Sequence, residues 1–169
     1  SLVDMPLKAC RYTVMLNDRG GVIDDLIVYR IEKEKWMIVV NGATTEKDAA
    51  HFLKNLTAQA SFKNISSRTG KLDVQGPQSL GVLRNIFGGG LSKLNYYTFS
   101  DFIFQNQHCI VSRTGYTGEL GFEIYISNNK VIKLWELLLK DSRIKPAGLG
   151  SRDTLRLEMG YPLYGQDID

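Results

Sequence analysis

Two glycine-containing segments carry the residues of this sequence that are best suited to bind a ligand. Residues 113–123 set three glycines among an arginine, a tyrosine and two glutamates within eleven positions. Glycine lets a backbone turn sharply or approach a ligand closely. The second segment, residues 145–153, presents Arg152 just after a loop rich in proline and glycine. A carboxylate and a guanidinium presented in this way could bind a small, flat, polar heterocycle.

A pair of carboxylates, Asp24 and Asp25, lies inside the apolar run of residues 22–28. Adjacent residues of a strand face opposite sides, so only one of the two can point into a given pocket. A carboxylate in such a strand is costly unless it is hydrogen-bonded or functional. Two interpretations stay open from spacing alone: a solvated acidic pair or loop cap, and a catalytic carboxylate.

Glu123 is the carboxylate of the glycine segment best placed to recognise a ligand. It alternates with Phe122 and Ile124, so one face of the expected strand presents Glu123 and Tyr125. A carboxylate there suits a donor–donor edge, such as an amide N–H beside an exocyclic amine. Taken alone, a purely structural role is favoured for Glu123, and Glu119 is expected to be a solvated loop residue.

Arg152 is expected near the start of a helix, where the helix dipole disfavours a cation. This placement indicates that another group holds it, the alternative being a pair with Asp153 or exposure to solvent. Arg156 and Glu158 are expected to form a surface pair. Four tyrosines could stack on a planar ligand, although tyrosine in strands most often packs in the sheet: Tyr12, Tyr97, Tyr116 and Tyr161.

The order of the expected elements predicts an α+β fold with antiparallel sheets built from hairpins and helices packed on them. Strands are predicted over residues 10–16, 22–31, 36–41, 72–75, 96–104, 109–112 and 122–126. Helices are predicted from Thr45 (capped by it, with Asp48 three residues on), from Pro77, after Asn128 with Leu134 and Trp135 inward, and near Ser151. The same order of elements predicts two related β-α-β units, residues 1–66 and 67–169.

Composition excludes several classes of function. The 21 basic and 18 acidic residues are scattered without a basic stripe, so nucleic acid is not indicated. The longest apolar run is far too short to span a bilayer. The two cysteines and two histidines lack metal-ligand spacing, so no metal is expected, and Cys10 and Cys109 are expected to be buried thiols. The chain opens without Met and is expected to be a piece of a longer protein.

Together the motifs resemble one family, the aminomethyltransferase or T-protein of the glycine cleavage system. The resemblance runs in order along essentially the whole chain, and its two long glycine-containing motifs are specific. It is carried by residues 14–17, 20–29, 39–48, 75–77, 112–123, 145–158 and 163–167.

The resemblance implies transfer of a one-carbon unit from an aminomethyl group on the lipoyl arm of the H-protein to tetrahydrofolate. Ammonia is released and 5,10-methylenetetrahydrofolate is formed. Asp25 matches the catalytic aspartate that faces the reacting folate nitrogen. Glu123 matches the glutamate that binds the pterin edge, and Arg152 matches the arginine that completes the folate site. The matching pocket neighbours are Tyr12, Asn41, Tyr97, Tyr116 and Tyr161.

The resemblance also implies a setting and leaves alternatives. Tetrahydrofolate is the implied co-substrate and the lipoylated H-protein the implied partner, with no metal, nucleic acid or membrane. The compartment would be the cytoplasm of a bacterium or the mitochondrial matrix of a eukaryote. The parent would be about twice as long, with an N-terminal segment and a C-terminal barrel-like domain outside this chain. Alternatives are the folate-binding domain of a demethylating oxidoreductase or of an iron–sulfur assembly factor, and a structural domain without a ligand site.

Overall fold

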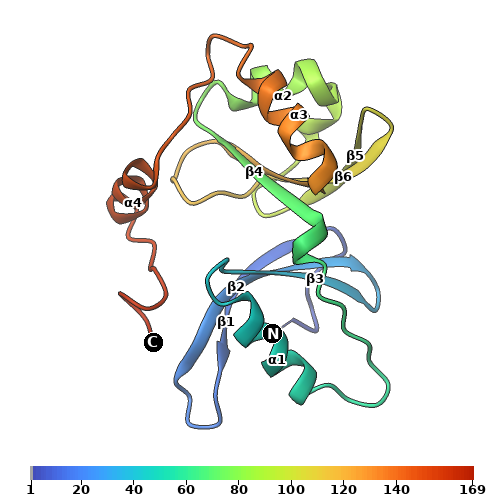
Figure 1. The fold of residues 1–169 in the computed structure, drawn as a ribbon, viewed down its shortest axis with the longest axis vertical. Helices are drawn as coiled ribbons and strands as arrows, with labels where there is room; N and C mark the ends of the chain where they lie inside the picture. The colour runs from blue at the N-terminus through green and yellow to red at the C-terminus, as the bar shows by residue number, and fades with distance from the viewer. Residues whose placement is uncertain (1) are drawn as a thin grey trace. The chain divides into compact units, whose positions relative to one another are not determined.

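The computed structural model describes residues 2–169, which divide by their packing into two compact units (Figure 1). The first unit comprises the residues up to Ser67 together with Pro162–Asp169, and the second is Arg68–Tyr161. The predicted boundary between residues 66 and 67 lies one residue from this division, but residues 162–169, predicted in the second half, pack with the first unit. Each unit holds one antiparallel sheet with helices, which confirms the predicted α+β class.

The first unit is a three-stranded sheet, in the order β1-β2-β3, with one α-helix. Its elements are β1 (Cys10–Leu16), β2 (Val22–Glu32), β3 (Lys35–Val40) and α1 (Thr45–Lys54). Alternation along β2 places Leu26 and Val28 on one face, where they pack with Met15 and with Phe52 of α1. Asp24 shares that buried face, so Asp25 lies on the opposite one.

The last residues of the chain belong to the first unit, where Tyr164 contacts Lys47. Lys47 of α1 donates a hydrogen bond to the Tyr164 hydroxyl at 3.0 Å and another to the carbonyl of Ile23 at 2.6 Å. Its ammonium also lies 4.5 Å from the centre of the Tyr164 ring. Residues 162–169 are therefore tied to the helix and to the strand that carries the acidic pair.

The second unit is a four-stranded sheet in the order β4-β7-β6-β5, with all neighbours antiparallel. Its strands are β4 (Thr69–Gln75), β5 (Phe99–Phe104), β6 (Gln107–Ser112) and β7 (Gly121–Ser127). Its helices are α2 (Ser79–Phe87), α3 (Asn128–Leu138) and α4 (Leu149–Glu158), with a short 3-10 turn at Gly89–Lys93. A further 3-10 turn, Ser66–Arg68, includes the residues at which the two units divide.

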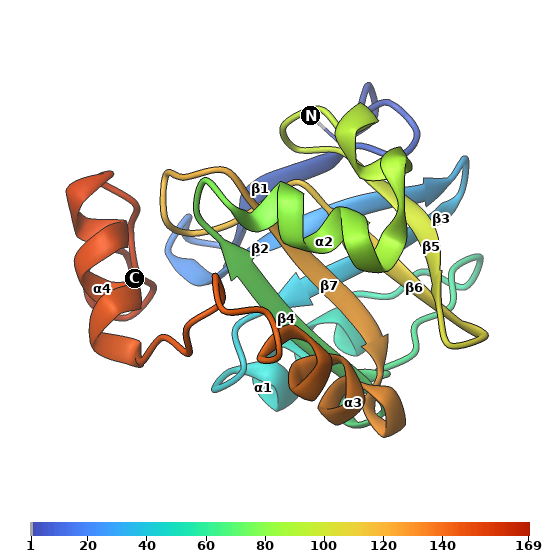
Figure 2. The same cartoon turned by 90° about the horizontal axis from the view of Figure 1, so that it is seen from above.

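One face of this sheet is apolar and the other is polar. Helix α2 packs on β5 and β7, and α3 packs on β4 and β7, so both helices cover the same face (Figure 2). Val111, Ile124 and Leu134 are completely buried there. Side chains alternate between the two faces of a strand, so Glu123, next to Ile124, lies on the opposite face. The polar side chains of β4 and β7 lie on that face as well.

Some element ends and faces differ from the prediction. The first helix is capped by Thr44 without a side-chain cap bond, and Asp48 is buried against the sheet instead of capping. Strand β5 begins only at Phe99 because Tyr97 has a left-handed backbone (φ +59°) that interrupts an extended run. The Trp135 side chain, predicted to face inward, is 42% exposed. No helix within residues 2–169 is long and apolar enough to cross a membrane.

Candidate functional site

Three of the predicted site residues meet in the first unit around the Asp25 carboxylate. The Tyr12 hydroxyl donates to Asp25 Oδ2 at 2.9 Å, and Asn41 Nδ2 donates to Oδ1 at 2.6 Å. Tyr12 lies on β1 beside this part of β2, and Asn41 directly follows β3. No cation of residues 2–169 forms an ion pair with Asp25. Its charge is therefore fixed in place by two neutral donors without being neutralised.

Asp24 holds Asn41 in the position that reaches Asp25. Asn41 Nδ2 also donates to Asp24 Oδ1 at 2.8 Å, and the Thr44 hydroxyl donates to Oδ2 at 2.5 Å. Burial would raise the pKa of Asp24. Hydrogen bonds involving Asp48, Thr44, Asn41 and the Asp25 backbone N–H outweigh burial and lower it below its ordinary value. Asp24 is completely buried, so its role is to position Asn41 rather than to meet a ligand.

Asp48 is a buried carboxyl that the sequence analysis assigned to helix capping. It is inaccessible to solvent, and no donor within residues 2–169 reaches hydrogen-bond geometry with either of its oxygens. Burial, and then hydrogen bonding with Asp24, raise its pKa to about 6. A protonated Asp48 that donates to the Asp24 carboxylate accounts for both observations. The sequence did offer an indication of this burial, because Asp48 lies four residues before Phe52 and therefore on the same face of α1.

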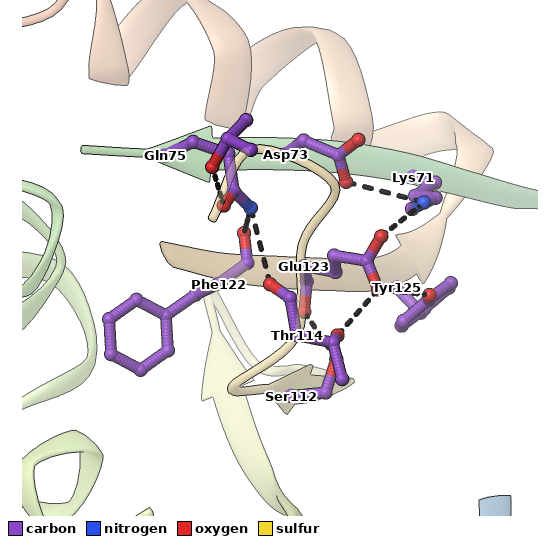
Figure 3. A network of polar contacts seen from close by, with 9 residues as sticks. Lys71, Asp73, Gln75, Ser112, Thr114, Phe122, Glu123 and Tyr125 are labelled. Atoms are coloured by element: carbon purple, nitrogen blue, oxygen red, sulfur yellow. Dashed lines mark hydrogen bonds and ion pairs between the residues drawn. The ribbon is translucent and has the colours of Figure 1, made fainter. Parts of the chain in front are cut away.

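Glu123 lies in a polar network on the polar face of the second sheet (Figure 3). Its Oε1 is 2.5 Å from the Lys71 ammonium. Its Oε2 accepts hydrogen bonds from the hydroxyls of Thr114, at 2.5 Å, and of Tyr125, at 3.1 Å. Ser112 in turn bonds the Thr114 hydroxyl at 2.6 Å. The predicted pairing of Glu123 with Tyr125 on one strand face is confirmed, whereas the sequence analysis missed Lys71 and Thr114.

The charges of this network are set by the competition between burial and ion pairing. Burial would raise the pKa of Glu123, but the charge and hydrogen bond of Lys71, with the Thr114 and Tyr125 hydroxyls, hold it below its usual range. Burial would lower the pKa of Lys71, yet Glu123 and Asp73 raise it. Burial raises the pKa of Asp73 despite the opposing effect of Lys71. Glu123 is thus an ionised carboxylate although it is only 4% exposed.

Arg152, Tyr116 and Tyr161 form a second group in the same unit. The Arg152 guanidinium carbon lies 4.5 Å from the centre of the Tyr116 ring. The rings of Tyr116 and Tyr161 are stacked, with centroids 5.8 Å apart and planes inclined by 24°. Within the described chain, Arg152 makes no ion pair with a carboxylate. The alternative of an Arg152–Asp153 pair is wrong, because Asp153 instead binds Arg156.

Arg156 is an internal residue and not the surface partner of Glu158 that was expected. Its side chain is 4% exposed, and its Nε donates to Asp153 at 2.8 Å. One of its terminal nitrogens donates to the carbonyl of Tyr161 at 3.3 Å. Arg156 therefore anchors the chain after α4, and with it the tyrosine that stacks on Tyr116.

Tyr97, the remaining predicted residue, packs edge-on against Tyr96 with ring centroids 4.7 Å apart. The structure thus brings the predicted residues together in two sets. Tyr12, Asn41 and Asp25 meet directly in the first unit, and Arg152 meets Tyr116 and Tyr161 in the second. Glu123 has its own network, and Tyr97 packs with a neighbour that was not predicted.

The glycine segment is shaped largely by Gln75. A Cβ on Gly115 or Gly121 would overlap the Gln75 side-chain amide. That amide donates to the carbonyls of Thr114, at 3.2 Å, and Phe122, at 3.4 Å (Figure 3). Two of the three glycines of the segment therefore make room for a side chain from β4.

A cavity of about 200 Å³ adjoins the glycine segment. It is lined by Tyr96, Arg113 and residues 114–121 except Tyr116 and Thr117. Neither Glu123 nor Arg152 lines it, but Thr114, whose hydroxyl donates to Glu123, does.

The two cysteines are buried thiols, as expected. Cys10 and Cys109 are both buried and form no disulfide. Burial, together with the charge of Asp101, raises the pKa of Cys109 to about 11. Across residues 2–169, no group of three or more histidine, cysteine, aspartate or glutamate side chains could hold a metal ion.

Comparison with known proteins places the chain in a family. The model of the GCVT N-terminal domain matches residues 1–169. The aminomethyltransferase of Caldanaerobacter subterraneus subsp. tengcongensis is 44% identical over 93% of this chain and 43% of its own length. That of Phocaeicola vulgatus is 41% identical over 99% of this chain and 48% of its own.

A solved structure agrees with these relatives. The crystal structure of glycine cleavage system aminomethyltransferase T from Bartonella henselae matches with a TM-score of 0.87 at 34% identity, over 98% of this chain and 45% of that one. The chain spans just under half the length of the curated relatives it matches. By the extent of these matches, this chain belongs to the GCVT N-terminal domain family.

Proposed function

We propose that this chain is the folate-binding, catalytic part of an aminomethyltransferase of the glycine cleavage system. The lipoylated H-protein supplies an aminomethyl group, and tetrahydrofolate accepts its carbon to give 5,10-methylenetetrahydrofolate. The observation that carries the proposal is the Asp25 carboxylate, which two neutral donors orient and no cation of residues 2–169 neutralises. The compartment would be a bacterial cytoplasm or a mitochondrial matrix.

Asp25 is suited to the charge that develops during this transfer. Two bonds of the carbon break, to the lipoyl sulfur and to the amine nitrogen, while two bonds to folate nitrogens form. The two protons lost by those nitrogens leave on ammonia and on the thiol. An oriented, uncompensated carboxylate can take up one of these protons in transit and stabilise positive charge on the reacting carbon. Alignment of the reactants can contribute about 7–11 kcal/mol in addition.

The second unit supplies the groups proposed to hold the co-substrate. The Glu123 carboxylate is ionised and can accept from the N–H and amine donors of a pterin edge. Arg152, stacked on Tyr116 and making no ion pair within the described chain, offers a cation to an anionic or electron-rich part of the ligand.

The test separates turnover from binding in the full-length protein. We expect Asp25→Asn to lower turnover with aminomethylated H-protein by about 100-fold or more, with little change in tetrahydrofolate affinity measured by calorimetry. Glu123→Ala should do the reverse and chiefly weaken binding. Asp18→Asn, in the exposed β1–β2 loop, is the matched control and should change neither.

The outcomes distinguish the alternatives. Equal losses of turnover and affinity in Asp25→Asn would contradict its catalytic assignment. A wild-type protein that binds tetrahydrofolate but never turns over aminomethylated H-protein would instead favour a folate-binding domain of a demethylating oxidoreductase or of an iron–sulfur assembly factor.

A further inference from the structure

Lys71 lies between two carboxylates on the polar face of the second sheet. Its Nζ is 2.5 Å from Glu123 Oε1 and 3.4 Å from Asp73 Oδ1 (Figure 3). Asp73 and Glu123 are direct partners in the antiparallel register of β4 and β7. Side chains at such paired positions lie about 5 Å apart at their Cβ atoms, so one ammonium can serve both carboxylates.

The acceptor capacity of Glu123 is already largely used. A carboxylate offers about four acceptor positions. Lys71 occupies one on Oε1, and the hydroxyls of Thr114 and Tyr125 occupy two on Oε2. A ligand with two adjacent N–H donors needs two positions. At least one of the present donors must therefore leave Glu123 before such a ligand can bind it.

Lys71 is the donor that can leave at the lowest cost. Thr114 and Tyr125 are buried, and the Thr114 hydroxyl is additionally held by Ser112. The Lys71 side chain is 36% exposed on a flexible four-carbon stem, and a second carboxylate is already within 3.4 Å. Movement toward Asp73 gives up the ion pair with Glu123 but keeps the existing one with Asp73, while the N–H donors of the ligand take the vacated position on Glu123.

We propose that Lys71 is a positioning residue, which holds Glu123 in place in the unliganded protein and moves to Asp73 when Glu123 accepts the N–H donors of a flat heterocycle. The proposal deepens the function proposed above and rests on it for the identity of that heterocycle, a reduced pterin. Asp73 then acts through Lys71, without touching the ligand.

The charges around the pair support this exchange. Glu123 and Lys71 both favour ionisation of the other, and the pKa of Asp73 is raised by burial and by the charge of Glu123. Arg152 acts on Asp73 in the same sense as Lys71, lowering its pKa. Approach of the ammonium to Asp73 therefore relieves a carboxylate that is otherwise costly to ionise.

The test is a double-mutant cycle in the full-length protein, with tetrahydrofolate as the probe. Asp73→Asn should weaken binding about tenfold, because Lys71 then has no second carboxylate to move to. In a Lys71→Met background, which keeps most of the apolar stem, Asp73→Asn should cause no further loss. Lys71→Arg keeps the charge and should preserve the sensitivity to Asp73→Asn. Circular dichroism confirms that each variant is folded.

A second measurement, made without ligand, tests whether Lys71 interacts with Glu123 in the unliganded protein. The Glu123 carboxyl carbon, followed by NMR through a pH titration, should titrate at higher pH in Lys71→Met than in the wild type, and Lys71→Arg should restore the wild-type midpoint. An unmoved midpoint in Lys71→Met overturns the proposal, as does an equal effect of Asp73→Asn in both backgrounds. A wild-type protein that binds no tetrahydrofolate refutes the proposed function and, with it, the movement to Asp73.

Discussion

Asp48→Asn is expected to stabilise the protein at neutral pH and progressively less as the pH falls. The folded-state pKa of Asp48 is raised from 3.8 to about 6, because the carboxyl is buried beside Asp24. A group with a raised folded pKa contributes stability that is fully present below its unfolded pKa of 3.8 and is lost as the pH rises through about 6. Asparagine has a similar shape, can still donate to Asp24 and cannot ionise.

The magnitude follows from the shift. From 3.8 to 6 is about 2 units, and at about 1.4 kcal/mol per unit the cost of ionising Asp48 in the folded protein is up to about 3 kcal/mol. The free energy of unfolding of Asp48→Asn, relative to the wild type, should therefore rise by about 2–3 kcal/mol between about pH 4 and about pH 7.5.

Urea unfolding measured at a series of pH values checks this expectation. A Trp135→Phe background leaves Trp36, on β3, as the fluorescent reporter of the first unit. Asp18→Asn, at an exposed loop position, is the control. The difference between its free energy of unfolding and that of the wild type should stay constant across the pH series. A difference between Asp48→Asn and the wild type that stays constant from about pH 4 to about pH 7.5 would refute the reasoning.

Two further substitutions test the site and its scaffold. Tyr12→Phe removes the 2.9 Å hydrogen bond to Asp25 and should lower turnover about fivefold, as expected for about 1 kcal/mol; unchanged steady-state turnover would show that the hydroxyl does not orient Asp25. Gly121→Ala places a Cβ against the Gln75 amide and should destabilise the protein by about 1–3 kcal/mol in urea unfolding. Gly89→Ala, with open space around it, is its control, and a Gln75→Ala background should abolish the difference between them.

Local patterns were sufficient to predict the fold class and the faces of β2. Alternation within one strand required Asp24 and Asp25 to lie on opposite faces, and the structure has Asp24 fully buried and Asp25 half-buried. The pairing of Glu123 with Tyr125 followed from the same rule. These successes depend on residues close in sequence, whose relative directions the strand geometry fixes.

The partners of the site residues could not be predicted because they come from other elements. Lys71 reaches Glu123 only through the β4–β7 register, and Asp48 reaches Asp24 only because α1 packs on the sheet. Gln75 lies more than forty positions from the Gly121 that accommodates it, so the motif gave no indication of that contact. The roles of Asp25, Glu123 and Arg152 toward tetrahydrofolate stay predictions.

The placement of residues 162–169 in the first unit has a consequence for synthesis on the ribosome. The second unit is a single stretch, complete once Tyr161 has been added, whereas the first still awaits the segment that carries Tyr164. Lys47 therefore gains its aromatic hydroxyl partner only after the whole inserted unit has emerged. A nascent chain would therefore complete the second unit while the first unit, which holds Asp24, Asp25 and Asp48, is still incomplete.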